Sequence, residues 1–334
     1  MSRTNGHVRY VVGVDLGGTN IVVGAMPEDG TRELAMRSEP THSELGAEAV
    51  VDRIAAMVED VIAEVMVSTG STRESFHGVG MGAPGPLDRQ RGVVVVAPNL
   101  GWHDFPLRDA VADRVRLPVT LDNDANCATV GEWWCGAARG ARNVVGMTIG
   151  TGIGGGLILD GQLFHGASDV AGEIGHTTID INGRYCRCGN YGCLEAYASG
   201  PAIALRAREA LLRDEVSVLR RMVDGQLERL TAAKVYQAAQ ENDALAREIV
   251  RDTATFLGAG IANLLNIFNP DVVVLAGGVT QAGDTLFEPL RAEVKRRAFR
   301  PAVERCRIVP GLLAGTAGVV GAVATFKAQK LGGV

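Results

Sequence analysis

This chain has no long apolar run. Its apolar stretches, such as residues 93–97, are about as long as a strand, whereas a membrane-spanning helix needs roughly 18 apolar residues or more. The first ten residues are polar and lack the apolar core of a secretion signal. We therefore expect a cytoplasmic protein that does not have a membrane as a partner.

Basic patches and cysteines are also scarce. The 334 residues carry a formal net charge of −5, and the short basic cluster at residues 295–297 has the composition of a solvated helix end. An acidic chain without a basic patch disfavours nucleic acid as a partner. There are six cysteines, and in the reducing cytoplasm clustered thiols favour a metal over a disulfide.

Half of these cysteines lie together, close to a histidine and between two glutamates, Glu173 and Glu195. The four clustered residues are His176, Cys186, Cys188 and Cys193. Thiolates and a neutral imidazole are the ligands that tetrahedral Zn²⁺ prefers. We therefore predict a structural zinc site that shapes a loop, and the flanking carboxylates place that loop in a polar substrate site.

Glycine is abundant, at 43 of 334 residues, almost twice the average of about 7%. Dense glycine turns follow apolar strands at residues 17–19, 150–156 and 277–278. Such turns leave backbone N–H groups free to face anions at the carboxyl ends of strands. The sequence therefore predicts loops that cradle a polyphosphate.

Two common nucleotide motifs are excluded. Residues 150–155 match G-x-G-x-x-G, but a strand at 157–159 and a turn at 160–161 follow where the dinucleotide fold requires a helix. The sequence G-x4-G-K-[ST] of the P-loop is absent as well.

The apolar periodicity predicts a mixed α/β protein. Strands are expected at 9–15, 79–83, 93–97, 118–122, 144–149, 157–159 and 272–276, and helices at 46–67, 201–251, 252–268, 287–299 and 316–330. A strand, a glycine turn and a second strand occur from residue 10 and again from residue 144, so two similar halves are predicted. We expect a small α/β domain of residues 1–121 plus 316–334 and a large one of residues 122–315.

An acidic segment, residues 121–126, joins the two halves. Asp124 stands at a predicted strand-to-helix junction over the cleft between them, where a carboxylate suits a general base, although a helix cap alone would also explain it. Asp15 ends the first strand and is either a turn-closing residue or a ligand for Mg²⁺ beside the phosphates.

These segments together resemble the ROK family (repressors, open reading frames and kinases), and the resemblance runs from about residue 10 to residue 325. The matching segments, in order, are DLGGTN at 15–20, GPLD at 85–88, NDAN at 123–126, GTGIG at 150–154, GEIGH at 172–176, CRCGNYGCLE at 186–195 and AGG at 276–278. The resemblance implies an actin/hexokinase-like (ribonuclease H-like) two-lobed fold with a duplicated mixed-sheet core and a zinc loop.

The resemblance also implies an ATP-dependent kinase that phosphorylates the 6-hydroxyl of glucose, with Mg²⁺ and structural Zn²⁺, and a homo-oligomer (dimer or tetramer). Asp124 matches the catalytic base, and the zinc ligands match the four residues of the cluster. Positions that match sugar contacts are Gly85, Asn99, Asn123, Asp124, Glu173, His176 and Glu195. Positions that match the phosphate and adenosine motifs are Asp15, Gly17, Gly18, Thr19, Asn20, Gly150, Thr151, Gly152, Gly154, Gly277 and Gly278.

Several alternatives stay open at this point. A kinase for N-acetylmannosamine, N-acetylglucosamine, mannose or allose would have the same motifs, and polyphosphate could replace ATP as donor. A sugar-responsive repressor of the same family is disfavoured, because a first strand near residue 10 leaves no room for an N-terminal DNA-binding domain. An actin-like filament former would need neither the zinc loop nor its acids. The chain departs from many family members at Asn20, where they have lysine, and residues 212–236 have no assigned function.

Overall fold

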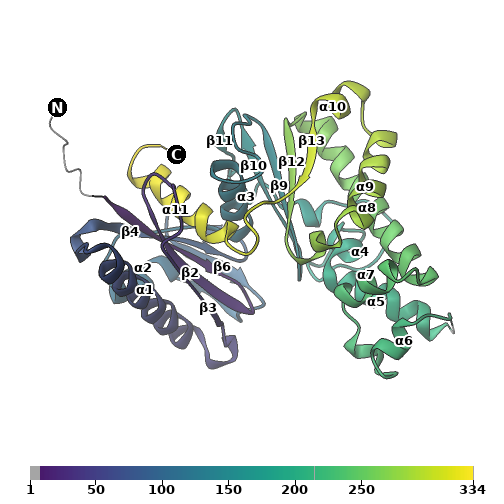
Figure 1. The fold of residues 1–334 in the computed structure, drawn as a ribbon, viewed down its shortest axis with the longest axis horizontal. Coiled ribbons are helices and arrows are strands. Elements are labelled where there is room, and N and C mark those ends of the chain that lie inside the picture. The colour runs from purple at the N-terminus through teal and green to yellow at the C-terminus, as the bar shows by residue number, and fades with distance from the viewer. Residues whose placement is uncertain (1–7, 214, 334) are drawn as a thin grey trace.

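The computed structural model describes residues 8–213 and 215–333 and has two lobes (Figure 1). Each lobe is built on a five-stranded mixed sheet, with the orders β3-β2-β1-β4-β8 and β11-β10-β9-β12-β13. In both sheets the first two strands in sequence form an antiparallel hairpin, and the first strand then pairs in parallel with a later one, β1 with β4 and β9 with β12. The predicted duplication is therefore confirmed.

The first lobe carries the N-terminal sheet, two helices and a smaller sheet. Its large sheet comprises β1 (Tyr10–Leu16), β2 (Asn20–Pro27), β3 (Ala35–Pro40), β4 (Phe76–Ala83) and β8 (Val119–Asn123). The small sheet comprises β5 (Leu87–Asp88), β6 (Val93–Ala97) and β7 (Trp102–Phe105), and the helices are α1 (Ala47–Thr69) and α2 (Leu107–Val115). The apolar stripe of α1 is buried against the large sheet, because its residues recur at helical spacing.

The second lobe carries the other sheet and most of the helices. Its strands are β9 (Val144–Ile149), β10 (Ile153–Leu159), β11 (Gln162–Leu163), β12 (Val272–Ala276) and β13 (Arg307–Pro310). Its helices are α4 (Glu195–Ala198), α5 (Gly200–Leu212), α6 (Leu219–Met222), α7 (Ala232–Gln240), α8 (Ala244–Phe268), α9 (Asp284–Arg297) and α10 (Arg300–Arg305). Short 3-10 turns are η1 (Ser43–Leu45), η2 (Arg73–Ser75), η3 (Ile174–His176), η4 (Leu227–Arg229) and η5 (Gly278–Ala282).

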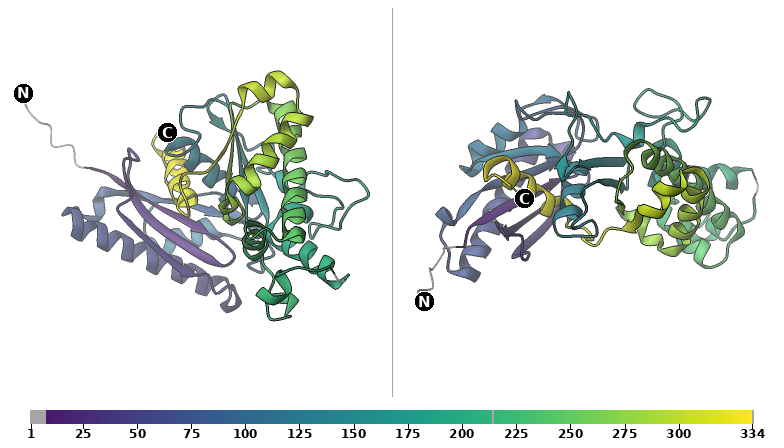
Figure 2. Two further views of the ribbon diagram at one scale, coloured as in Figure 1. Left: turned by 45° about the vertical axis from the view of Figure 1, so that its right-hand side comes forward. Right: turned by 90° about the horizontal axis from the view of Figure 1, so that it is seen from above.

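Two helices lie where the lobes meet, α3 (Asp124–Trp134) and α11 (Ala317–Lys330) (Figure 1). Glycines let their backbones touch: a Cβ atom at Gly321 would lie 1.6 Å from the carbonyl oxygen of Cys127. A Cβ atom at Gly80 of β4 would likewise lie 1.9 Å from the carbonyl oxygen of Ala322. The C-terminal helix is therefore pressed onto both α3 and the first sheet, and the lobes lie side by side around it (Figure 2).

Most predicted elements are confirmed, but some boundaries were wrong. Residues 201–251 are not one helix, because α5, α6 and α7 are separate and α8 already begins at Ala244. Asp243 sets that start, since its carboxylate accepts the N–H of Ala246 at 2.9 Å. The strand expected at 157–159 begins at Ile153, inside the glycine run, and the helix expected at 287–299 spans 284–297. Within the described residues, none of the helices is long and apolar enough to cross a membrane.

Candidate active site between the lobes

The junction of β8 and α3 places the acidic segment at the boundary of the two lobes. Asn123 caps α3, because its side-chain oxygen accepts the N–H groups of Ala125 and Asn126 at 2.9 and 3.2 Å. This leaves the amide NH₂ of Asn123 as a donor. Asp124, the first residue of α3, accepts the N–H of Ala125 with one carboxylate oxygen at 2.8 Å.

Two carboxylates of the cleft are hard to ionise. Burial raises the pKa of Asp124 to about 6, and the charge of Glu173 adds to the effect. Burial raises the pKa of Asp15 to about 7, with a contribution from Asp124. Both residues keep part of their surface open, so the surrounding protein atoms strip water from them without closing the cleft. The mutual influence of these acids shows that Asp15, Asp124 and Glu173 are neighbours in space.

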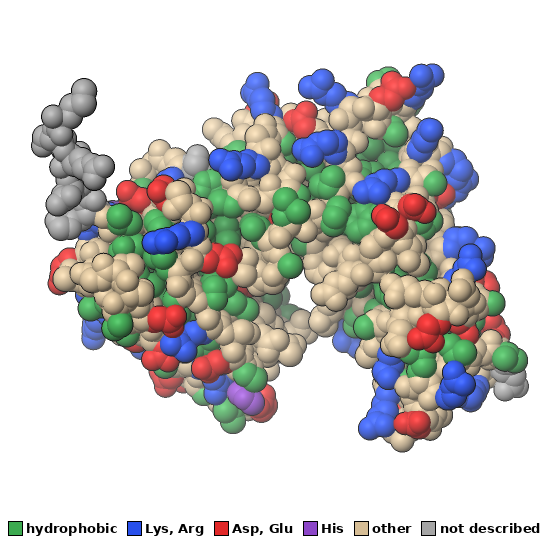
Figure 3. Space-filling model, in the orientation of Figure 1, with side chains coloured by type: hydrophobic (Ala, Val, Ile, Leu, Met, Phe, Trp, Pro, Cys, Tyr) green, Lys and Arg blue, Asp and Glu red, His purple; other side chains and the backbone are tan. Residues whose placement is uncertain are grey.

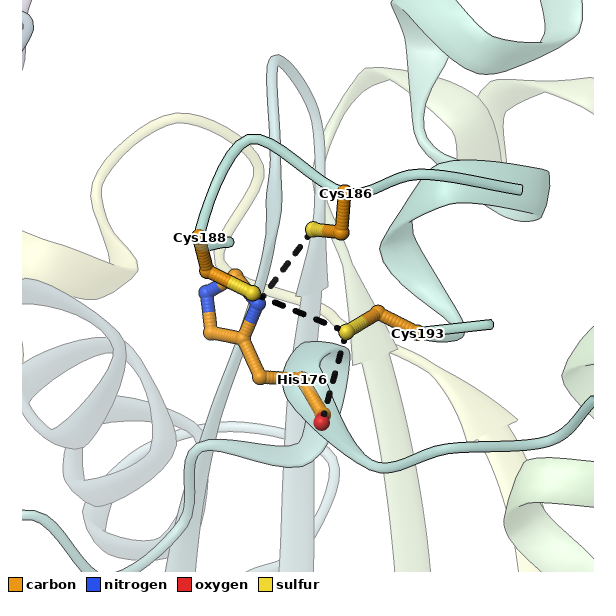
Figure 4. Close-up of side chains that lie close together, drawn as sticks. All are labelled: His176, Cys186, Cys188 and Cys193. Carbon is orange, nitrogen blue, oxygen red and sulfur yellow. Dashed lines mark hydrogen bonds between the residues drawn. The ribbon is translucent and has the colours of Figure 1, made fainter. Parts of the chain in front are cut away.

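The four predicted zinc ligands lie close together (Figure 4). The ligand atoms of His176, Cys186, Cys188 and Cys193 all lie within 4.8 Å of one another. The sulfurs of Cys188 and Cys193 are 3.6 Å apart, and Nδ1 of His176 is 3.8 Å from the sulfur of Cys186. A tetrahedral ion with bonds of about 2.0–2.3 Å needs ligand separations of about 3.5–3.8 Å. The four residues therefore fit a Zn²⁺ ion.

Glu195 connects the zinc loop to the glycine turn of the second lobe. Its Oε2 accepts the N–H of Ile153 at 2.8 Å, and its Oε1 lies 4.0 Å from the sulfur of Cys186. Glu195 was predicted only as a partner for sugar hydroxyls. Because one of its oxygens is already engaged by Ile153, Glu195 links the zinc loop to the strand that follows the second glycine turn.

The remaining predicted sugar contacts come from the first lobe and from η3. Asn99 lies exposed between β6 and β7, and a Cβ atom at Gly18 would lie 3.1 Å from its Cβ, so the first glycine turn adjoins it. Gly85 has φ 91°, and a Cβ there would meet the carbonyl oxygen of Val96 at 2.1 Å, so its role is in the turn itself. Glu173, at the start of η3, is open to solvent, yet partial burial and the charge of Glu195 raise its pKa.

The predicted phosphate glycines fall into two groups. At most of these positions only glycine fits, because a Cβ atom would lie closer than 3.0 Å to a neighbouring atom. These positions are Gly17, Gly152, Gly154 and Gly277. Gly150 and Gly278 differ, because a Cβ atom at either one meets nothing within 4 Å and neither has a left-handed backbone. Their surroundings are open, which is the condition for a ligand to approach the backbone.

A cavity of about 1030 Å³ lies beside these two open glycines. Its lining includes Gly150, Thr151, Gly278 and Glu195, together with apolar residues of the segment 227–236. Residues 212–236, for which the sequence suggested no function, therefore contribute a wall of this cavity; Asp214 within them lies outside the described residues. A notch also separates the two lobes in the space-filling view (Figure 3).

Sequence reasoning missed one buried carboxylate next to the catalytic candidate. Asp122 on β8 is 1% exposed and holds Nδ2 of Asn126 at 3.1 Å and the N–H of Asn123 at 2.9 Å. The signal was present in the run of acids and amides at 122–126, but the apolar neighbours of Asp122 gave no hint of its partners.

With this geometry, the chain can be compared with known proteins. The model of the ROK family matches residues 11–329, and the chain belongs to that family. A curated glucokinase of Halalkalibacterium halodurans is 38% identical over 324 residues, which cover 96% of each chain. The structure of a ROK glucokinase from Streptomyces griseus in complex with glucose and AMPPNP is 36% identical, with a TM-score of 0.80, over 94% of this chain and 98% of that one.

Repressors are similar over a smaller share of their length. The xylose repressor of Caldicellulosiruptor bescii is 34% identical over 273 residues, which are 82% of this chain but 68% of the repressor. The glucokinases of Halalkalibacterium halodurans and Thermotoga maritima, by contrast, are matched over 96% and 98% of their length.

Proposed function

We propose that this protein is an ATP-dependent glucokinase, which transfers the γ-phosphoryl group of ATP to the 6-hydroxyl of glucose. The observation that carries the proposal is the position of Asp124 at the junction of β8 and α3, with a pKa raised to about 6 and with the charge of Glu173 nearby. A general base works best when its pKa is close to the operating pH. The full-length similarity to glucokinases supports the choice of glucose.

In this mechanism Asp124 removes the proton of the 6-hydroxyl as the sugar oxygen attacks the γ-phosphorus. The bond from that phosphorus to the bridging oxygen breaks, ADP leaves, and the proton passes from Asp124 to solvent. Sugar orientation comes from hydrogen-bonding groups on both lobes: Asn99, Asn123, Glu173, His176 and Glu195. Phosphoryl transfer depends mainly on such positioning and on charge neutralisation.

The donor side is formed by the glycine turns and Asp15. Gly150, Thr151 and Gly278 line the cavity, where phosphate groups would lie against the backbone of the two turns. The N–H of Gly150 itself donates to the carbonyl oxygen of Gly152 at 2.9 Å and so shapes the turn. Asp15 is a poorly solvated carboxylate at the end of β1, so it fits a Mg²⁺ ion, which when bound neutralises phosphate charge. Gly17, Gly18 and Thr19 form the turn that follows β1, and Asn20 begins β2.

The zinc cluster serves the sugar side. Nδ1 of His176 faces the cysteines, so its Nε2 is left for a sugar hydroxyl. A bound Zn²⁺ supplies structural support and fixes the tautomer of His176. The chain's own residues then hold Glu173 and Glu195 on the same loop as acceptors.

The cavity favours a nucleotide over inorganic polyphosphate as donor. Its lining includes apolar residues of the segment 227–236 and of α5, which suit a purine base. It also includes Arg184, Arg187 and Arg208, whose charges suit phosphates. Purified protein with Mg²⁺ should phosphorylate glucose with ATP much faster than with polyphosphate, and glucose faster than mannose, allose or the acetamido-hexoses. A panel of these acceptors with each donor, followed by sugar 6-phosphate formation, tests the proposal. Absence of phosphorylated glucose would contradict it.

The pH dependence of the reaction should report the base. Because Asp124 must be ionised to accept a proton and burial raises its pKa to about 6, kcat/KM for glucose should fall as the pH drops through that value. Below it the decline approaches about tenfold per pH unit. Initial rates at saturating ATP between pH 4.5 and 9 measure this, and a profile that stays flat to pH 4.5 would contradict the assignment.

Alanine at the two open glycines should separate donor binding from folding. Gly150→Ala and Gly278→Ala add a methyl group where no protein atom lies within 4 Å, so the free energy of unfolding should be unchanged or rise by up to about 1 kcal/mol. The methyl obstructs a phosphate that approaches the turn, and the weaker contact should raise KM for ATP about tenfold or more. KM for glucose should stay within about twofold in the same assay, and an unaltered KM for ATP would count against this donor site.

Three expectations stay predictions. The free cysteines within the described residues agree with a reducing compartment, which supports the cytoplasm. A dimer or tetramer is expected from the family. The division into residues 1–121 plus 316–334 and residues 122–315 stays a prediction as well. The helix α11 packs on β1 and β4 of the first lobe and also on α3, which this division assigns to the large domain.

A further inference from the structure

The buried carboxylate of Asp122 lies against two side chains, Arg89 and His165, that come from opposite lobes. Its Oδ2 lies 3.0 Å from Nε of Arg89 and 3.0 Å from Nε2 of His165. Arg89 lies in the turn between β5 and β6 of the first lobe, whereas His165 follows β11 of the second lobe. A fully buried carboxylate needs such partners, because its charge is costly without them.

Arg89 also reaches a second acid. Its Nη1 lies 3.4 Å from Oδ1 of Asp169, and its backbone N–H donates to Oδ2 of the same residue at 3.2 Å. One guanidinium group therefore bridges Asp122, two residues before the base, and Asp169, four residues before Glu173. Arginine suits this role, since its planar group can serve two carboxylates at once.

The bridge acts on the segment that carries the sugar-binding acid. Residues 164–172 have no regular secondary structure between β11 and η3. One backbone hydrogen bond, from the N–H of Ala171 to the carbonyl oxygen of His165 at 3.1 Å, closes this loop on itself. At the far end, Gly172 is pinned by β10, because a Cβ there would lie 2.8 Å from the carbonyl oxygen of Gly155. At the near end, His165 and Asp169 hold the segment to Asp122 and Arg89.

We propose that Arg89 is a positioning residue for sugar binding: by bridging Asp122 and Asp169 it holds the loop that leads to Glu173 in register with the base Asp124. Arg89 itself does not touch the reacting atoms. Neither the family motifs nor the zinc cluster includes Arg89 or Asp169. The inference rests on the proposed function for the identity of the sugar.

The most specific test removes the ion pair between Arg89 and Asp169 and leaves the contacts of Asp122 in place. Asp169 has φ 58°, a left-handed conformation that asparagine adopts as readily as aspartate, so Asp169→Asn keeps the loop backbone and loses the charge. We expect the Kd for glucose, measured by calorimetry, to rise about tenfold, because a displacement of about 1 Å in a binding group has effects up to about 10²-fold. The Kd for ADP should remain within about twofold of the parent value.

A second variant and a control complete the experiment. Arg89→Met should weaken glucose binding at least as much, and the Arg89→Met/Asp169→Asn double variant should match Arg89→Met within about twofold, because the two residues act through one contact. The control is Arg91→Met in the same turn. The side chain of Arg91 is 70% exposed and makes only a long contact, 3.7 Å, with Asp88. The Arg91→Met variant should bind glucose normally.

The outcomes separate this inference from the proposed function. Unchanged glucose affinity in Asp169→Asn and Arg89→Met, with normal phosphorylation by the parent protein, would overturn the positioning role alone. Parallel losses of glucose affinity, ADP affinity and melting temperature would also overturn it, since they indicate a merely structural contact. A parent protein that binds glucose with the expected variant effects but forms no glucose 6-phosphate would support the bridge and contradict the kinase.

Discussion

Asp124→Asn should lower kcat for glucose phosphorylation at least about 10²-fold, the usual scale for a lost general base. An asparagine oxygen can still accept the N–H of Ala125, which now binds Asp124 at 2.8 Å, so the start of α3 should persist. The amide cannot take the proton of the 6-hydroxyl. ADP release in a coupled assay measures the effect, and the Kd for glucose from calorimetry should change by less than about fivefold.

The same substitution should not reduce stability. Because burial raises the pKa of Asp124 to about 6, the ionised carboxylate is less favourable in the folded state than in the unfolded chain at any pH above that value. A neutral isostere removes this cost, so the melting temperature of Asp124→Asn at pH 8 should equal or exceed that of the parent. A suitable control is Asp160→Asn in a hairpin turn, where the side chain is 82% exposed. Turnover above about a tenth of the parent value would refute the assignment of the base.

Cys188→Ser should remove the zinc and weaken sugar binding. A serine hydroxyl is a poor ligand for Zn²⁺ compared with a thiolate, and Cys188 is exposed, so the substitution leaves the packing of the core intact. Without the metal, His176 and Glu195 lose their fixed orientation, and we expect the Kd for glucose to rise at least about tenfold. The Kd for ADP should change by less than about threefold, because Gly150 and Gly278 lie on the strand ends of the second sheet.

Metal content and affinity must change together for this prediction to hold. Elemental analysis should find one zinc per parent chain and almost none in Cys188→Ser. Cys306→Ser provides the matched control, because Cys306 lies outside the cluster and is half-buried; it should retain both zinc and glucose binding. Undiminished zinc in Cys188→Ser would contradict the proposed ligand set.

The predicted donor residues illustrate how far sequence patterns reach. The turns after residues 16, 149 and 276 were correctly placed at strand ends, because apolar runs and glycines are local signals. Which of their glycines face open space was not predictable. Gly150 and Gly152 are both glycines and only two positions apart. A Cβ atom at Gly152 would lie 2.5 Å from the carboxylate of Glu195, whereas one at Gly150 would have no neighbouring atom within 4 Å.

Asp122 and Asp124 show the same difference between what neighbouring residues predict and what only the tertiary structure adds. The junction of strand and helix at Asn123 and Asp124 was predicted, since capping depends on neighbours in the chain. The raised pKa of Asp124 depends on burial and on Glu173, which is distant in sequence. The partners of Asp122 are equally remote, because Arg89 and His165 come from opposite lobes.

What the sequence alone determined was therefore the family, the duplicated order of strands, the four candidate zinc ligands and the candidate base. Each of these is encoded by residue types at short, regular spacing. Only the tertiary structure decided that Glu195 binds Ile153, that residues 227–236 line the donor cavity and that Arg89 bridges Asp122 and Asp169. Such contacts join segments far apart in the chain, and their geometry arises only when both sheets and the helices between them have packed.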